Sequence, residues 1–243
     1  AARDYPHADE LVLLAPMKAE LPPEVFTRLF EPPKSDGNGF DRDNLLKASK
    51  LLDDAGWVLK NRLRVNVKTG KPLSFELLIA SGANDQWVLP FKKNLARLGV
   101  TMNIRQVDIA QLTNRKRSRD YDMMQTLWAA QPWPSSDLQI SWASGYIDSS
   151  YNAPGVKSPV IDALIAKIVA AQGDKEKLLP LGRALDRVLT WNYYMLPMWY
   201  MGKDRVARWD KFSLPAVRPV YTLGFDTWWY DVNKAAKLPA ARR

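Results

Sequence analysis

The sequence predicts a mixed α/β fold in which a mostly parallel sheet is flanked by helices. Strand-like and helix-like stretches alternate between residues 63 and 128. Strands that are separated by helices pair in parallel, through right-handed crossovers. The composition agrees, because 47% hydrophobic and 25% charged residues over 243 positions are typical of a globular protein with a sizeable core.

The first part of the chain contains few predicted elements. Proline is frequent up to residue 40, and we interpret residues 1–42 as a connecting arm with one short helix near residues 23–30. A longer helix is predicted from Asp43, where apolar residues recur every three or four positions until Gly56 supplies a left-handed stop.

The middle of the chain supplies the predicted sheet. Two alternating runs, residues 63–67 and 73–79, surround Gly70 and predict a β-hairpin. They are followed by a helix with Pro90 inside its pattern, a strand, a short polar helix and a last strand, at residues 87–98, 100–104, 109–117 and 121–128.

The last third begins with an irregular stretch and continues with two helices. Ser158 and Pro159 form a helix start before an apolar stripe that extends to Val169, and Asp174 opens a second helix. Residues 194–201 and 205–209 are predicted strands, and residues 235–243 are expected to fray.

The composition excludes several kinds of site. The chain has no cysteine and one histidine, His7, so a disulfide framework, a thiolate site and a multi-histidine metal site are excluded or nearly so. No glycine-rich phosphate loop occurs. We therefore expect no metal, no cofactor and no catalytic residue, and no apolar run is long enough to cross a bilayer.

Charge gives a weak indication of a partner. The 35 basic and 26 acidic residues leave a net charge of +9, and residues 115–119 (RKRSR) are the densest basic run. No aromatic side chain interleaves with that run, so a solvated helix end explains it better than a nucleic-acid site. A basic interaction module nevertheless stays open as a reading, and we expect no nucleic-acid partner.

The best candidate site is the loop after the strand at residues 121–128. Eight of the ten tryptophans fall between positions 128 and 229, and Trp128 and Trp133 bracket this loop. Ligands of open α/β sheets bind outside the carboxyl ends of the strands. Ser81 and Asp108 follow the other two strands and are expected on the same rim.

Two alternatives remain at this stage. Each tryptophan could simply pack in the core. Asp120 and Asp122 lie two apart on a predicted strand and share a face, so a carbohydrate-active enzyme or carbohydrate-binding module with tryptophan platforms and a carboxylate pair is the competing class. A hydrated strand edge is the simpler explanation of the two acids.

Several strings, taken in order, resemble extracytoplasmic solute-binding proteins of the dipeptide/oligopeptide class. They cover most of residues 43–233, and those near the carboxyl end are most similar to the Yej-type members of that class. The strings are residues 45–57 (LLKASKLLDDAGW), 94–100 (NLARLGV), 119–123 (RDYDM), 160–165 (VIDALI), 181–189 (LGRALDRVL), 197–199 (PMW), 209–212 (WDKF) and 227–231 (TWWYD).

The resemblance implies a fold and a function. The fold would be the C-terminal lobe of a type II periplasmic-binding-protein-like structure at residues 43–200, with residues 201–243 returning toward a second lobe and ending in a tail. The protein would be a non-enzymatic, monomeric periplasmic receptor that closes on an oligopeptide or peptide conjugate and delivers it to an inner-membrane ABC permease. Relatives are more than twice as long, so the chain is expected to be a C-terminal fragment.

One departure from the family pattern concerns the ligand's amino terminus. In many relatives an aspartate after the strand tryptophan holds that amine, whereas this chain has the neutral Gln131. Gln131 cannot form the charge-assisted bond that a carboxylate would form, so Asp137 or another acid would replace it, or the amine would be held weakly or not at all. Trp128 and Trp133 would form apolar walls, and Ser81, Gln131 and Ser135 would donate or accept hydrogen bonds.

Overall fold

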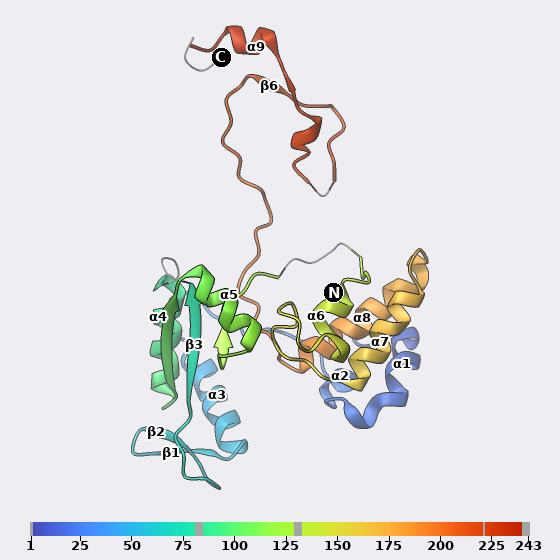
Figure 1. Ribbon diagram of the computed structural model, residues 1–243. Helices are drawn as coiled ribbons and strands as arrows, with labels where there is room; N and C mark the ends of the chain where they lie inside the picture. The colour runs from blue at the N-terminus through green and yellow to red at the C-terminus, as the bar shows by residue number, and fades with distance from the viewer. Residues whose placement is uncertain (1, 81–84, 129–132, 221, 240–243) are drawn as a thin grey trace. The chain divides into compact units, whose positions relative to one another are not determined.

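The computed structural model describes residues 2–80, 85–128, 133–220 and 222–239 (Figure 1). The chain divides into two compact units, Ala1–Met195 and Leu196–Arg243. The parallel sheet and most helices belong to the first unit. Within the ranges given above, no helix has both the length and the apolar character that crossing a membrane requires.

A three-stranded parallel sheet is the centre of the α/β part of the first unit. β3 (Ser74–Ala80) lies between β4 (Thr101–Val107) and β5 (Met123–Met124). Leu77 of β3 is in register with Ile104 of β4. The parallel pairing predicted from the sequence is therefore confirmed, although β5 is much shorter than the predicted strand.

Each face of the sheet is covered by one of the crossover helices (Figure 1). α4 (Asp85–Arg97) covers the face that carries the buried Leu77. Side chains alternate along a strand, so Glu76 lies on the opposite face, where its Oε1 accepts a hydrogen bond from Arg115 Nη1 of α5 (Ile109–Ser118) at 3.0 Å. Both helices were predicted.

The hairpin predicted around Gly70 forms only beside its turn, where the Asn66 amide donates to the Lys71 carbonyl at 2.9 Å and the Leu73 amide to the Arg64 carbonyl at 2.7 Å. Beyond these residues the two predicted strands take other partners. β2 (Leu63–Asn66) pairs with β1 (Trp57–Lys60), while β3 joins the parallel sheet. Asn61 and Arg62, with φ of 53° and 66°, make the two-residue left-handed turn that suits the twist of an antiparallel pair. Alternation identifies a strand but not its partner, and the turn at residues 61 and 62 lacks the glycine that would have indicated it.

A buried arginine joins the hairpin to its neighbours. The Arg64 side chain is 2% exposed. Its guanidinium donates to Asp53 Oδ1 at 2.6 Å, to the Leu98 carbonyl at 2.9 Å and to the Ser49 hydroxyl. α3 (Arg42–Asp54), β2 and the end of α4 are therefore held by one side chain, in which each donor group of the fork has an acceptor.

The remaining helices of the first unit share a second core. α7 and α8 supply most of its buried residues, among them Ile161, Leu164 and Leu185. Ser158 caps α7 by accepting from the Ile161 amide, as predicted. The elements are α1 (Ala8–Leu14), η1 (Ala15–Glu20), α2 (Glu24–Thr27), α6 (Leu138–Trp142), η2 (Ser144–Tyr146), α7 (Pro159–Ala170) and α8 (Lys175–Trp191).

The sequence did not predict α1, α6 or η2. α1 packs on α8, where Glu10, at 0% exposure, accepts from Arg187 Nη2 at 3.0 Å and from Arg187 Nε at 3.1 Å. Such a pair is tolerated in a core because each charge is matched by the other. The assignment of residues 1–42 to an arm between lobes stays a prediction.

The second unit contains short elements. Asp231 caps its last helix and also accepts from the Ser213 hydroxyl at 2.7 Å. The hydrogen bonds from Ser213 and from the Lys234 amide lower the pKa of Asp231. The elements are β6 (Phe212–Ser213), η3 (Phe225–Thr227), β7 (Trp229–Tyr230) and α9 (Val232–Ala236), with β6 and β7 antiparallel.

The strands predicted at residues 194–201 and 205–209 are wrong. All of these residues are described, and none of them lies in a strand. Their apolar side chains are largely exposed, with Leu196 at 55% and Tyr200 at 90%. An apolar run can form a strand only where another strand offers its edge, and these residues have no such partner in the structure.

Candidate ligand-binding site

The carboxyl ends of the parallel strands define the predicted rim. Ser81 directly follows β3 but lies outside the described residues. Asp108 directly follows β4, and its carboxylate accepts from the Gln111 amide at 2.8 Å. Asp108 therefore caps α5, which explains an acidic residue at this position without a ligand.

Trp128 belongs to an aromatic cluster that begins just after β5. Its indole stacks on that of Trp142, with ring centroids 4.7 Å apart and an interplanar angle of 29°. Trp142 is 3% exposed and its ring lies 6.4 Å from that of Tyr194. Trp128 is half-buried against this core, so only part of its ring can contact a ligand.

Trp142 and Tyr194 were missed by the sequence reasoning. The enrichment of tryptophan in the second half of the chain was visible, but the contact between Trp128 and Trp142 joins residues in different elements. No local pattern records such a contact.

Trp133 is the more accessible of the two predicted aromatic walls. Its side chain is 42% exposed, and Lys175 Nζ lies 5.7 Å from the ring centroid. That distance is within the range of a cation–π interaction. Gln131, which the prediction placed between the two tryptophans, lies outside the described residues.

Pro134, the residue after Trp133, holds the loop against α8 and the turn before it. Gln172 Nε2 donates to the Pro134 carbonyl at 3.3 Å. On the other side, a Cβ added to Gly182 of α8 would lie 2.5 Å from Pro134 Cγ. The absence of a side chain at Gly182 therefore permits the proline ring to lie directly against α8.

Ser135 and Asp137 complete the predicted set. The Ser135 hydroxyl accepts from the Asp137 amide at 3.4 Å, and Ser135 is half-buried. Asp137 is exposed at the start of α6, and its carboxylate makes no capping hydrogen bond. Among the residues that the structure describes, Asp137 has no ion-pair partner, so its charge is available to a ligand.

The structure brings some of these residues together and not others. Trp133, Ser135 and Asp137 share one loop, which contacts α8 through Lys175 and Gly182 and the turn before α8 through Gln172. Over the described ranges, no hydrogen bond, ion pair or ring contact joins Asp108 to Trp128 or Trp133. The set of ligand-binding residues remains a prediction.

The two acids of the competing enzyme hypothesis have structural partners. Asp120 Oδ2 pairs with Arg115 Nη2 at 3.1 Å. Asp122 Oδ2 accepts from the Glu76 amide at 2.8 Å and so extends the hydrogen bonding of β3. In the described part of the chain, no group of three or more potential metal ligands occurs.

Two tyrosines of the first unit have raised pKa values. Tyr121 donates to the Ala153 carbonyl at 2.7 Å, and burial raises the pKa of its phenol, which Arg119 partly opposes. Burial also raises the pKa of Tyr194. Both phenols stay neutral well above pH 7 and can act only as neutral hydrogen-bonding groups there.

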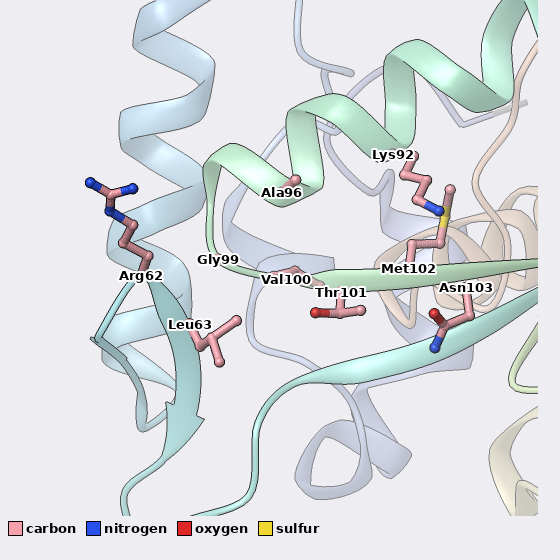
Figure 2. Close-up of a pocket in the computed structure, with 9 residues that line it drawn as sticks. All are labelled: Arg62, Leu63, Lys92, Ala96, Gly99, Val100, Thr101, Met102 and Asn103. Carbon is pink, nitrogen blue, oxygen red and sulfur yellow. The ribbon is translucent and has the colours of Figure 1, made fainter.

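Two cavities lie away from the predicted rim. One, of about 180 Å³, lies at the amino end of β4 beside Gly99, Lys92 and Leu63 (Figure 2). Another, of about 380 Å³, is lined by α1, α7 and α8 and includes Leu13, Lys167 and Leu181. Neither includes a residue of the predicted rim, and the first lies at the opposite end of β4 from Asp108.

Comparison with known families identifies the class of protein. Residues 18–150, which include the whole parallel sheet, match the middle region of the bacterial extracellular solute-binding proteins, family 5. The chain belongs to this family. The fold class predicted from the sequence, a mixed α/β lobe of the type II periplasmic-binding-protein kind, is confirmed.

Individual relatives agree with this assignment. The chain is 72% identical over its whole length to the protein YejA of Escherichia coli K12, of which it covers 40%. It is 38% identical over 232 residues to the probable peptide-binding protein YejA of Agrobacterium fabrum, with 94% of the chain and 38% of the relative covered. The chain thus spans about two fifths of the length of these relatives.

A solved structure supports the fold alone. The oligopeptide-binding protein AppA of Bacillus subtilis, in complex with a nonapeptide, superposes with a TM-score of 0.53 at 18% identity. The match covers 76% of this chain and 38% of AppA.

Proposed function

We propose that the chain is part of the substrate-binding component of an ABC importer, which binds an oligopeptide or peptide conjugate between two lobes in the periplasm. The observation that carries this proposal is the family match over residues 18–150. The name of the Agrobacterium relative, a probable peptide-binding protein, supports a peptide as the ligand. The partners would be this ligand and an inner-membrane permease, and the receptor would act as a monomer.

In this proposal residues 43–200 form the ligand-binding lobe. Trp133 offers an exposed ring, Trp128 a partly exposed one, and Ser135 and Asp137 offer polar atoms on the same loop. Ser81, Gln131 and Asp108 complete the proposed rim. Backbone groups would pair with the main chain of the peptide, which gives affinity without strict reading of its sequence.

Two further parts of the proposal concern the ends of the lobe. Residues 1–42 and 201–243 would connect it to the second lobe. The exposed apolar side chains at Leu196, Met198 and Tyr200 support this, because a run of that kind favours burial against other parts of a longer protein.

The proposed receptor performs no chemistry on its ligand. The carboxylate pair required by the enzyme hypothesis is occupied, since Asp120 pairs with Arg115 and Asp122 bonds to the backbone of β3. A glycosidase needs two carboxylates that face a substrate. A binding role therefore accounts for the described residues better.

The proposal is tested on the full-length protein. Material that co-purifies with it is identified by mass spectrometry, and the affinity for a recovered peptide is measured by calorimetry. Trp133→Ala is expected to weaken binding about tenfold, because the contact between the indole ring and the bound peptide is lost. Tyr151→Ala is the matched control, since Tyr151 is 67% exposed and outside the loop.

Two results would contradict the proposal. One is that no peptide or peptide conjugate co-purifies and none binds. The other is that Trp133→Ala and Tyr151→Ala bind the peptide equally well, which would show that the loop with Trp133, Ser135 and Asp137 (the tryptophan loop) does not contact the peptide.

A further inference from the structure

β4 is the outermost strand of the parallel sheet on its side. The Thr101 amide donates to the Leu73 carbonyl, which fixes the direction of the backbone groups along the strand. Backbone groups alternate in direction from one residue to the next, so those of Met102, Ile104 and Gln106 point away from β3. In the described ranges no strand pairs with this edge of β4.

A pocket lies at the start of the same edge. It has a volume of about 180 Å³, and the buried residues Val100 and Met102 form part of its wall. The small side chain of Ala96 on α4 leaves space above them (Figure 2). An apolar cavity of about 150 Å³ holds a benzene ring, so this pocket has room for one large apolar side chain.

The charge beside the pocket is positive. Lys92 lines it from α4 and reaches toward Met102, whereas Arg62 points its guanidinium away (Figure 2). Neither cation has an ion-pair partner among the residues described. Lys92 therefore favours an occupant that carries a carboxylate.

We propose that the edge of β4 is a docking site for an acidic, extended segment of a partner protein. The segment would add as a strand along Met102, Ile104 and Gln106, place one apolar side chain in the pocket and set a carboxylate against Lys92. Strand addition of this kind derives affinity from main-chain hydrogen bonds and specificity from a side-chain pocket. A second copy of the chain fits less well, because it would bring another Lys92 and another net charge of +9 to the edge.

The variant Gln106→Pro removes one backbone N–H group from the outer edge of β4 and changes little else. The Gln106 side chain is exposed, and its amide points away from β3. Proline at an outward position of an edge strand keeps the inner ladder intact while it deletes the outer N–H. Gln106→Ala keeps that N–H and is the matched control.

Lys92 provides an independent test. Lys92→Glu reverses the charge beside the pocket, and Lys93→Glu makes the same change one position along α4, at an exposed residue that does not line the pocket. Equal changes in net charge thus separate a local effect from a general one.

The experiment uses the full-length protein and an acetylated, amidated peptide of alternating aspartate and leucine. Binding is followed by calorimetry, and hydrogen exchange locates the amides that become protected. We expect protection at Met102, Ile104 and Gln106, with affinity reduced about fivefold by Gln106→Pro and by Lys92→Glu but not by either control. Unchanged melting temperatures would show that the variants are folded.

Several outcomes would overturn the proposal. One is that Gln106→Pro and Lys92→Glu bind the peptide as tightly as the wild type. Another is that Lys93→Glu loses as much affinity as Lys92→Glu. A third is that the amides of the β4 edge are already protected in the free protein, which would mean that another segment or copy covers the edge. Because the peptide could also enter the ligand cleft, the measurement is repeated with the cleft saturated by the co-purified ligand. Binding at the edge persists under saturation, and it does not depend on the proposed transport function.

Discussion

At the scale of single residues, Asp137 and Gln131 bear on how a ligand's amino terminus would be held. The Asp137 carboxylate has neither a capping hydrogen bond nor an ion-pair partner in the described structure, although it stands at the start of α6. Caps and ion pairs occupy Asp108, Asp120 and Asp174. An exposed acid without such a partner on the tryptophan loop is suited to bind a cation.

The prediction at this scale concerns a peptide's free amine. In the full-length protein, Asp137→Asn is expected to weaken binding of a peptide with a free amino terminus about tenfold, because the ion pair with the peptide's ammonium group is replaced by a hydrogen bond to an uncharged amide. The same peptide with an acetylated amino terminus should bind wild type and variant equally. Asp148→Asn, at another exposed acid, is the control, and equal affinities of wild type and Asp137→Asn for the free amine would exclude Asp137 from this role.

At the scale of elements, the corner between α4 and β4 depends on Gly99. Its φ is +81°, and a Cβ there would lie 2.8 Å from Leu59 Cδ1, 2.9 Å from the Arg64 amide nitrogen and 3.0 Å from the Arg62 carbonyl. The Gly99 carbonyl also accepts from the Arg64 amide at 2.8 Å. The β1–β2 hairpin and the α4–β4 corner therefore pack backbone against backbone.

Gly99→Ala is expected to destabilise the protein more than replacement of a left-handed glycine by alanine usually does. Strain of the backbone conformation contributes about 1 kcal/mol, and overpacking against the hairpin adds about 1–3 kcal/mol. Gly70→Ala is the matched control, since its φ is +68° and nothing lies within 4 Å of a Cβ added there. Denaturant unfolding measures the free energy of unfolding of both variants. An equal decrease in the two would show that the hairpin moves aside without an energetic cost.

At the scale of the whole molecule, stability should fall in alkaline solution. Burial raises the pKa of both Tyr121 and Tyr194 above the ordinary value of 10.0. In the unfolded chain these phenols ionise first, so their contribution to the free energy of unfolding is fully present below pH 10.0 and is lost as the pH rises through the folded-state pKa values.

The double variant Tyr121→Phe, Tyr194→Phe is therefore expected to unfold with a weaker dependence on pH above about pH 10 than the wild type. Denaturant unfolding in steps of pH measures this dependence. Tyr5→Phe, at a side chain that is 55% exposed, is the control and should leave the slope unchanged. An identical slope in the double variant would contradict the assignment to the two buried phenols.

The fold could be predicted where local signals decide it. α3 and α7 begin at side chains that cap them, Asp41 and Ser158, and their apolar spacing is helical throughout. Strand pairing is different, because it depends on an edge supplied by a distant segment. β3 therefore paired with β4 and β5 rather than with its neighbour β2, and residues 194–201 formed no strand at all.

The candidate site was predictable only in part for the same reason. The order of elements was enough to place Trp128 after a parallel strand. It was also enough to place Asp108 at the carboxyl end of β4, although not to show that Asp108 caps α5. The stacking of Trp128 on Trp142 and the seat of Pro134 against Gly182 are contacts between distant segments, which no periodicity records.

Gly182 of α8, which has no side chain, is also a position that can be substituted to move the loop packed against it. Any larger residue there would have to push the ring of Pro134 outward, and Trp133 would move with its neighbour in the chain. Substitutions at this one helical position would thus shift the proposed ligand-binding loop from the side that faces α8. If this loop contacts a peptide as proposed, such variants would change which peptides bind while every proposed ligand-binding side chain stays the same.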